Sequence, residues 1–413
     1  MTEAYISLED ARDLTGCSTS FLLQLSKNKI IQTKQEDNTR KVRWKDLKKV
    51  AELVELPHRL VKKEVFDRET PPQGVLLYEN TDQEKKDAAF FLNRLETGDC
   101  HYWMRLMDKI VQTVVTSPPY WGVRRYPGQQ EVEWLDGTKV ALGNEGDPDD
   151  YVRHTLEILR QVKLVLKDSG VIWWNIGDTY FTRAVIREST TERLDAYESR
   201  RSDRWRDYPV KRYSSGHPYL RDKDLALIPF KIATGAQRLG FWVRSIVIWS
   251  KPNLMPEPVK DRPTTSHEYV LMLTKSKHYF YNTEAAKERA LTEAILRENG
   301  KQTSTDKRNL RTVWSFAVES ANHSNHTAAF PLELPTRCIL ASSREGDLIF
   351  DPFLGSGTTA VAADRLGRRY FGCDIHSEFV AEAKERIEVD RREREVGPKQ
   401  PESTKTKFKQ ALF

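Results

Sequence analysis

The stretch DLIFDPFLGSGTTAVAADRLGRRYFGCDI, residues 347–375, decides the fold of this chain. An apolar run ends at Asp351, a turn follows, and a helical pattern leads to a second apolar run that ends at Asp374. The turn and the first helical position carry small or hydroxyl residues: Gly355, Ser356, Gly357 and Thr358. Strand, glycine turn, helix and strand in this order are typical of a parallel sheet that binds a ligand beyond the carboxyl ends of its strands.

The acids at the two strand ends indicate which ligand the turn binds. Asp374 can accept hydrogen bonds from ribose hydroxyls. Asp351 precedes the glycine turn, where a carboxylate would repel a pyrophosphate and attract an ammonium group. Ala360 occupies the position of the third glycine in the sequence motif of dinucleotide-binding sites, and one variant of that motif tolerates alanine. A dinucleotide-binding fold therefore remains an alternative. S-adenosylmethionine has both a ribose and an amine, and the acids therefore favour it.

The rest of the chain extends this unit into a larger sheet. Short apolar runs at 112–117, 170–178, 242–252 and 269–276 predict further strands, and helical spacing predicts a helix over 149–170. Alternation of strands and helices predicts an α/β fold with a doubly wound, mostly parallel sheet.

One predicted strand ends in a rigid corner, TSPPYWG at 116–122. Pro118 and Pro119 have no amide hydrogen to donate and fix their own φ, so the ladder of hydrogen bonds stops there. A plain turn would explain the prolines. The serine before them and the two aromatic residues after them raise the question of a functional site.

Taken together, the two stretches resemble the amino-group DNA methyltransferases in which the catalytic motif precedes the cofactor motif. The resemblance covers about 96–388. It includes ETGDC at 96–100, the segment 251–276 and HTAAFPLELP at 326–335, which is similar to the helix that leads into the cofactor strand. It implies the methyltransferase fold, S-adenosyl-L-methionine as the cofactor, and double-stranded DNA as the partner.

The resemblance also assigns the site residues. The catalytic positions it implies are Ser117, Pro118, Pro119 and Tyr120. The cofactor positions it implies, together with the acids and glycines discussed above, are Asp99, Asp351, Phe353, Gly355, Ser356, Gly357, Thr358 and Asp374. No metal site is predicted, because the four cysteines are scattered without CxxC spacing.

The corner at 116–122 suits transfer to an exocyclic amine. Such a nitrogen is a poor nucleophile because its lone pair is delocalised into the base. If the Ser117 hydroxyl and the Pro118 carbonyl accept its hydrogens, the lone pair is freed for direct attack on the sulfonium methyl group. Tyr120 can stack on a base flipped out of the duplex, and Trp121 can wall the pocket. Methylation of ring carbon five would need a cysteine that usually follows proline, and no cysteine here does.

The target base is predicted from the serine. Among the amino-group DNA methyltransferases that this chain resembles, adenine enzymes usually carry Asp or Asn before the two prolines, whereas Ser-Pro-Pro is typical of cytosine amino methylation. We therefore expect a site-specific cytosine-N4 methyltransferase of a restriction-modification system, with a cognate restriction endonuclease as a further partner. Two alternatives stay open: an adenine-N6 enzyme, and a DNA-binding regulator whose methyltransferase domain is inactive.

The N-terminal residues 1–61 form a separate basic unit. Two capped helical patterns, the first of which begins at Ser7 and ends at Gly16, and two short strand patterns predict a winged helix-turn-helix. They resemble the MerR/excisionase type. From Lys27 to Lys49 there are nine Lys/Arg against three Asp/Glu, which favours DNA contact over a packing or dimerisation module.

The remaining boundaries follow from composition. We expect a linker at 62–89, a catalytic domain at 90–390 with DNA-recognition insertions near 182–224 and 283–325, and a flexible tail at 391–413. The net charge of +6 hints weakly at an anionic partner. The absence of a long apolar run and of a signal segment predicts a cytoplasmic protein of a bacterium, an archaeon or a phage, without a membrane partner. The residues leave the oligomeric state open.

Overall fold

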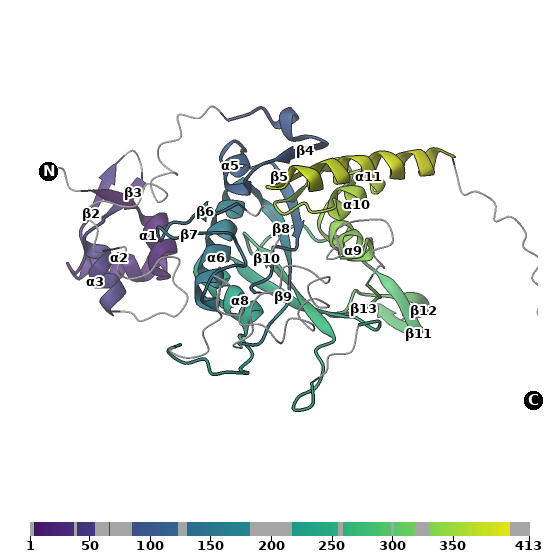
Figure 1. Cartoon of the computed structure of the whole chain (residues 1–413), viewed down its shortest axis with the longest axis horizontal. Helices are drawn as coiled ribbons and strands as arrows, with labels where there is room; N and C mark the ends of the chain where they lie inside the picture. Colours follow the sequence, from purple (N-terminus) through teal and green to yellow (C-terminus); the bar gives the residue numbers. More distant parts are fainter. Residues whose placement is uncertain are drawn as a thin grey trace, which may run out of the picture.

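A computed structural model shows a small N-terminal unit beside a larger α/β unit (Figure 1). The residues that the structure describes are 4–36, 39–53, 66, 85–122, 130–181, 217–254, 259–298, 301–318 and 330–396. Most of the predicted linker, most of the predicted insertion near 182–224, a smaller part of the insertion near 283–325 and the end of the predicted tail lie outside these ranges. No helix within them combines the length and the hydropathy needed to cross a bilayer.

The N-terminal unit combines three helices with a three-stranded sheet in the order β1-β3-β2. Its elements are β1 (Tyr5–Ser7), α1 (Leu8–Thr15), α2 (Thr19–Lys27), β2 (Thr33–Glu36), β3 (Thr39–Arg43) and α3 (Asp46–Leu53). Helix α1 begins after Ser7, whose hydroxyl accepts a hydrogen bond from the Asp10 amide, and ends at Gly16 with a φ of 72°. The predicted helices and hairpin are confirmed, whereas β1 was not predicted. The MerR-type resemblance stays a prediction.

Contacts of Phe66 and Arg160 join this unit to the rest of the chain. Phe66, which lies within the predicted linker, packs on the buried Trp44 with 5.4 Å between ring centroids. The Arg160 guanidinium is 2% exposed and forms ion pairs with Asp10 and Asp13 of α1. A charge buried to this degree needs its partners, so the N-terminal unit and the larger unit are coupled in stability.

The larger unit is built on an eight-stranded sheet in the order β13-β9-β10-β8-β5-β14-β15-β4. Its elements are η2 (Ala88–Phe91), β4 (Arg94–Thr97), α5 (Cys100–Arg105), β5 (Val111–Thr116), β6 (Val132–Glu133), β7 (Lys139–Val140), α6 (Pro148–Val165), β8 (Leu166–Ile176), α8 (Ile228–Arg238), β9 (Trp242–Ser250), β10 (His267–Thr274), β11 (Glu288–Glu298), β12 (Lys301–Arg308), β13 (Val313–Ser315), α9 (Glu333–Ser342), β14 (Leu348–Asp351), α10 (Thr358–Arg365), β15 (Arg369–Asp374) and α11 (Ser377–Val396). Among the described strands of this sheet, only β10 runs antiparallel to its neighbours, which confirms the prediction of a mostly parallel α/β fold.

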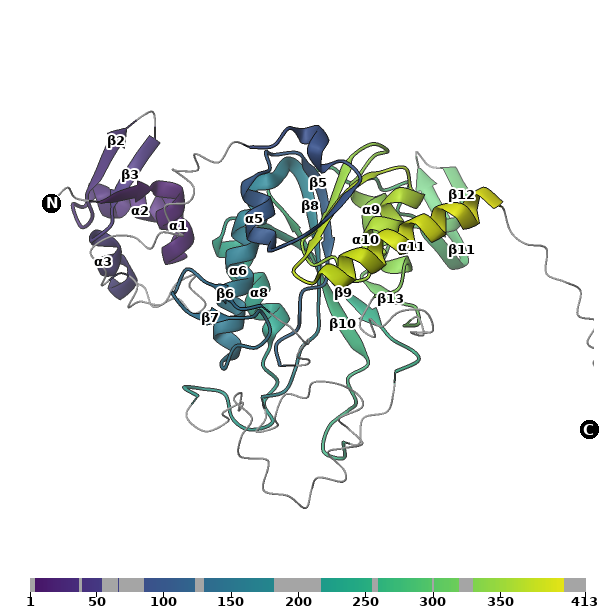
Figure 2. The same cartoon turned by 45° about the horizontal axis from the view of Figure 1, so that its top comes forward.

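Each face of the sheet is covered by its own helices. Helices α5, α6 and α8 lie on one side, and α9, α10 and α11 lie on the other (Figure 2). Successive strand residues alternate between the two cores: Val114 and Phe350 belong to one core, and Val115 and Ile349 belong to the other. From β5 the chain continues through α6 to β8 on one side, and from β14 it continues through α10 to β15 on the other side. The strand order therefore reverses between the parallel neighbours β5 and β14, which is a topological switch point.

Two predicted boundaries were wrong. The helix expected over 149–170 ends at Val165, because Leu166 is already extended and pairs with Val111 of β5. A flexible tail was expected from 391, but residues 391–396 belong to α11, which continues to Val396. Arg391 and Arg394 form ion pairs with Asp364 of α10, and these pairs hold the last turns of α11 against the domain.

Candidate active site

The predicted site residues gather at one edge of the sheet. In the parallel ladders Thr97 pairs with Asp374, and Thr116 pairs with Trp174. The carboxyl ends of β4, β5, β8, β14 and β15 therefore meet, and each carries a polar residue within two residues of its end. These residues are Asp99, Ser117, Asn175, Asp351 and Asp374. Residues far apart in the sequence are thus brought to one edge of the sheet.

Asp374 organises the glycine turn. One carboxylate oxygen accepts a hydrogen bond from the Gly355 amide at 2.9 Å, and the other accepts one from the His376 amide at 3.0 Å. Gly357 has a φ of 79°, and a Cβ there would lie 2.7 Å from the Cβ of Ala383 on α11. The turn therefore requires glycine at this position, both for its backbone conformation and for its close approach to α11.

The hydroxyls of Ser356 and Thr358 make contacts within the protein. Both are buried, and the Arg386 guanidinium of α11 donates to the Ser356 hydroxyl at 3.1 Å and to the Thr358 hydroxyl at 2.9 Å. Their side chains tie the turn to α11. Nothing in the local sequence indicated Arg386, which lies 28 residues beyond Thr358.

Asp351 is a buried carboxylate at the end of β14, with 3% of its surface exposed. One of its oxygens accepts hydrogen bonds from the Thr116 hydroxyl at 2.6 Å and from the Phe353 amide at 3.1 Å. Burial raises the pKa of Asp351 from its ordinary 3.8 to about 6. Phe353 is half-buried and meets Trp174 edge-to-face, with 6.0 Å between ring centroids.

Asp99 caps α5 at the end of β4. Its carboxylate accepts a hydrogen bond from the His101 amide, and the same oxygen lies 3.0 Å from His101 Nδ1. The side chain of Asp99 is 37% exposed, so one part of the carboxylate faces the solvent at the edge where Asp374 lies.

The Ser-Pro-Pro-Tyr corner is held by residues that the sequence did not indicate. The Tyr151 hydroxyl donates to the Pro119 carbonyl at 2.8 Å. The Trp121 indole donates to the Glu145 carbonyl at 2.8 Å, and the Glu145 carboxylate is 2.9 Å from His154 Nδ1. Trp121 is 1% exposed and belongs to the core, so the expectation that it walls the pocket was wrong.

Ser117 and Tyr120 belong to a polar network across three strands. The Ser117 hydroxyl donates to the Tyr120 hydroxyl at 3.0 Å, and the Tyr120 hydroxyl donates to Glu268 of β10 at 2.8 Å. The Asn175 amide donates to both Tyr120 and Glu268 at 2.8 Å. Lys251 forms an ion pair with Glu268. The one available signal in the sequence was a charged residue beside the apolar run at 269–276, because Glu268 immediately precedes that run.

This geometry can be compared with known proteins. The sequence pattern of the N6_N4_Mtase family, described as DNA methylase, matches residues 111–385. The Type II methyltransferase M.SmaI of Serratia marcescens is 36% identical, and the alignment covers 71% of this chain and 90% of that protein. The Type II methyltransferase M.Cfr9I of Citrobacter freundii is also 36% identical, with 73% of this chain and 86% of that protein covered.

Among solved structures, the PvuII DNA methyltransferase (cytosine-N4-specific) is similar with a TM-score of 0.48 and 16% identity, over 74% of this chain and 92% of that one. The putative DNA modification methylase TTHA0409 of Thermus thermophilus has a TM-score of 0.46 and 24% identity, over 72% of this chain and 94% of that one. The family match spans both the Ser-Pro-Pro-Tyr corner and the glycine turn. The chain therefore belongs to the N6_N4 family of DNA methylases, the amino-group DNA methyltransferases.

Proposed function

We propose that this chain methylates the exocyclic N4 nitrogen of cytosine at a specific site in double-stranded DNA. The observation that carries the proposal is the corner at the end of β5, where Ser117 and the rigid Pro118–Pro119 pair stand beside the strand ends that carry Asp351 and Asp374. The chain is a Type II DNA methyltransferase of the amino-group family. What we propose in addition is that its target base is cytosine.

The residues at this edge of the sheet fit S-adenosylmethionine, the cofactor of this family. The carboxylate of Asp374 lies at the tip of β15, where it can accept hydrogen bonds from the ribose hydroxyls. Asp351 is a buried carboxylate that accepts hydrogen bonds from neutral groups, among them the Thr116 hydroxyl and the Phe353 amide, and the amine of the ligand would compensate its charge. When bound, S-adenosylmethionine supplies an electrophilic methyl group.

The catalytic corner acts by positioning. The Ser117 hydroxyl and the Pro118 carbonyl accept the two hydrogens of the exocyclic amine, which shifts the nitrogen toward a tetrahedral geometry and frees its lone pair. Because Pro118 and Pro119 fix the backbone, the carbonyl keeps its direction without reorganisation during the reaction. The ring of Tyr120 supports the flipped base.

Nucleoside mass spectrometry tests the choice of base. Duplex DNA incubated with the protein and S-adenosylmethionine should contain N4-methylcytosine, and DNA incubated without protein should not. We expect N4-methylcytosine because of the serine before the two prolines. Cytosine enzymes of this family typically carry a serine there, where adenine enzymes usually carry Asp or Asn. N6-methyladenine as the sole product would contradict the cytosine assignment. DNA binding without any methyl transfer would favour an inactive regulator. A cognate restriction endonuclease with the same recognition site stays part of the proposal.

Asp374 offers a test of the cofactor site. Asp374→Ala should weaken S-adenosylmethionine binding by about 1–3 kcal/mol, because it removes a charged acceptor for the ribose and the partner of the Gly355 amide. Isothermal calorimetry measures the loss. Glu378→Ala, which removes an exposed carboxylate from the first turn of α11, is the matched control and should bind normally. Unchanged affinity of the Asp374 variant would remove this residue from the site.

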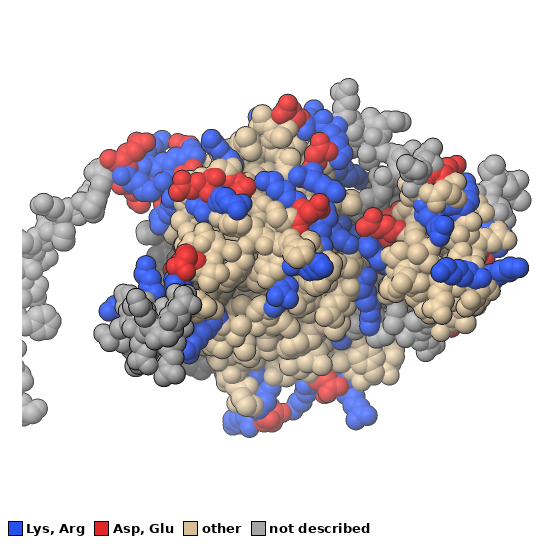
Figure 3. Space-filling view, turned by 180° about the vertical axis from the view of Figure 1, so that it is seen from behind, with Lys and Arg blue, Asp and Glu red and all other residues tan. Residues whose placement is uncertain are grey.

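The N-terminal unit is proposed to add DNA affinity without taking part in the chemistry. Lys27 and Lys29 at the end of α2 and Arg40 on β3 are exposed, and Figure 3 shows Lys and Arg side chains over this unit. Phosphate contacts by such residues release counterions and make binding depend on salt.

Neutralising these three residues tests that role in the full-length chain, which keeps the buried partners of Arg160 in place. The Lys27→Gln, Lys29→Gln and Arg40→Gln triple variant should bind DNA more weakly, and its slope of log affinity against log salt should fall by about one for each phosphate that is no longer neutralised. Cofactor affinity should not change. The control carries Lys277→Gln, Lys384→Gln and Arg392→Gln, which are exposed in the larger unit. An unchanged salt slope in the first variant would indicate a packing or dimerisation module.

A further inference from the structure

We propose that Glu268 is a positioning residue, which acts through the Tyr120 hydroxyl to fix Ser117 as a hydrogen-bond acceptor for the target amine. The inference rests on the role of Ser117 proposed above and adds two groups to it. Glu268 lies 148 residues from Tyr120 in sequence, on the antiparallel strand β10.

The direction of the hydrogen bonds follows from the donor inventory of the groups. An ionised carboxylate can only accept, so the Tyr120 hydroxyl uses its single proton for Glu268, at 2.8 Å. The Tyr120 oxygen can then only accept, and it does so from the Ser117 hydroxyl at 3.0 Å. The one proton of Ser117 is therefore donated to Tyr120, and its oxygen can only accept. The Asn175 amide donates to that oxygen at 3.4 Å, which leaves its second lone pair for the target amine.

The fixed direction of the Ser117 proton is important because the substrate is an amine. A serine hydroxyl that rotates freely can either accept from the amine or donate to a lone pair of the base. Donation to the amine nitrogen would engage the lone pair that must attack the methyl group. The Glu268–Tyr120–Ser117 relay removes that alternative, and it does so before substrate binds, which is the advantage of a preorganised site.

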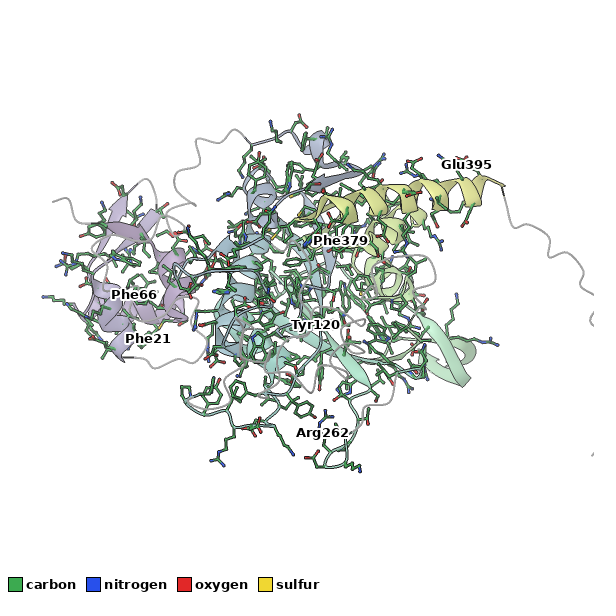
Figure 4. All side chains as sticks on the ribbon, viewed as in Figure 1. Phe21, Phe66, Tyr120, Arg262, Phe379 and Glu395 are labelled. Carbon is green, nitrogen blue, oxygen red and sulfur yellow. The ribbon has the colours of Figure 1, made fainter. Side chains whose placement is uncertain are left out.

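The surroundings keep the relay in this state. Lys251 forms an ion pair with Glu268, and the Asn175 amide donates to Glu268 at 2.8 Å, so the carboxylate is held by two donors besides Tyr120. Burial and the nearby Glu268 raise the pKa of Tyr120 well above its ordinary value, so the phenol keeps its proton. Figure 4 shows Tyr120 in the interior of the larger unit.

Gly177 provides the space that the relay needs. It follows β8, and a Cβ at this position would lie 2.9 Å from Cε2 of the Tyr120 ring. Without a side chain at Gly177, the ring lies against the end of β8, where its hydroxyl reaches both Asn175 and Glu268. The glycine, the tyrosine and the glutamate come from three separate segments of the chain and meet only at this point.

The test measures single-turnover methylation of a DNA duplex at saturating S-adenosylmethionine with Tyr120→Phe, Glu268→Gln and the double variant. Each single variant should react about tenfold more slowly than the wild type. The double variant should be no slower than the slower single variant, because both changes break one relay. Affinities for DNA and cofactor should stay within about twofold of the wild type. Tyr269→Phe is the matched control on the same strand, where it removes a hydroxyl that lies 2.9 Å from His267 Nε2, and it should react normally.

The outcomes separate the relay from the function on which it rests. A wild-type rate for Tyr120→Phe would overturn the relay and leave the ring with a stacking role only. A wild-type rate for Glu268→Gln, or independent additive losses, would overturn the role of Glu268. If Ser117→Ala loses turnover while both relay variants keep it, the relay fails and the proposed function stands. If Ser117→Ala keeps turnover, the proposed catalytic site fails, and the relay fails with it. Should Glu268→Gln not fold because Lys251 loses its partner, Tyr120→Phe, which keeps every charge, decides.

Discussion

Replacing Ser117 by alanine should lower the turnover number about 10²- to 10³-fold and leave S-adenosylmethionine affinity unchanged. The loss is of the size observed when one preorganised hydrogen-bonding group is removed from a reacting centre. Alanine deletes the acceptor for one amine hydrogen, while the Pro118 carbonyl and the base-stacking ring of Tyr120 remain. The variant therefore binds both substrates but no longer frees the lone pair of the nitrogen.

Single-turnover transfer of labelled methyl to duplex DNA measures this loss, and calorimetry measures cofactor affinity. Ser169→Ala is the matched control. Its hydroxyl donates to Gln112 at 3.1 Å near the opposite end of β5 and β8, and its removal should leave turnover unchanged. A Ser117→Ala protein that methylates at the wild-type rate would show that the corner at 116–122 is only a turn.

Asp351→Asn should change stability and cofactor affinity in opposite directions. At pH 8 the variant should bind S-adenosylmethionine about a hundredfold more weakly, because it loses a charged partner for the amine worth about 3 kcal/mol. At the same pH its free energy of unfolding should rise by up to about 3 kcal/mol. An asparagine can keep the bonds from Thr116 and Phe353 without placing a charge in the core.

The sign of the stability change follows from the pKa of Asp351. Its folded value of about 6 lies above the ordinary 3.8, so the native state binds the proton more tightly than the unfolded state does. The ionised carboxylate therefore lowers stability progressively as the pH rises from about 4 to about 6, and in full above that. Wild type and Asp351→Asn should unfold alike below about pH 4 and should differ most at pH 8.

Cofactor binding should show the matching dependence. Because the amine binds the ionised carboxylate, wild-type affinity should be constant above about pH 6 and should fall toward tenfold per pH unit below it. Asp351→Asn should lose this dependence. Asp347→Asn, which changes a carboxylate just before the start of the same strand, is the control and should bind the cofactor as the wild type does. Unchanged cofactor affinity in Asp351→Asn would remove Asp351 from the site.

The sequence by itself determined the features whose physical causes lie within a few residues. The run from 347 to 375 predicted strand, turn, helix and strand, and the structure contains β14, α10 and β15 at those positions. Ser7 and Gly16 predicted the ends of α1, since a hydroxyl cap and a left-handed glycine act on the adjacent turn only. The family could likewise be predicted, because both of its motifs are local.

The tertiary structure alone decided which side chains surround those motifs. Glu268 reaches Tyr120 because β10 pairs antiparallel with β8, and Arg386 reaches the glycine turn because α11 packs on α10. The end of α6 was likewise set by the pairing of Leu166 with β5 and not by helical spacing, which continues past it. Strand order, register and helix packing are properties of the whole sheet, and the periodicity of a single segment does not contain them.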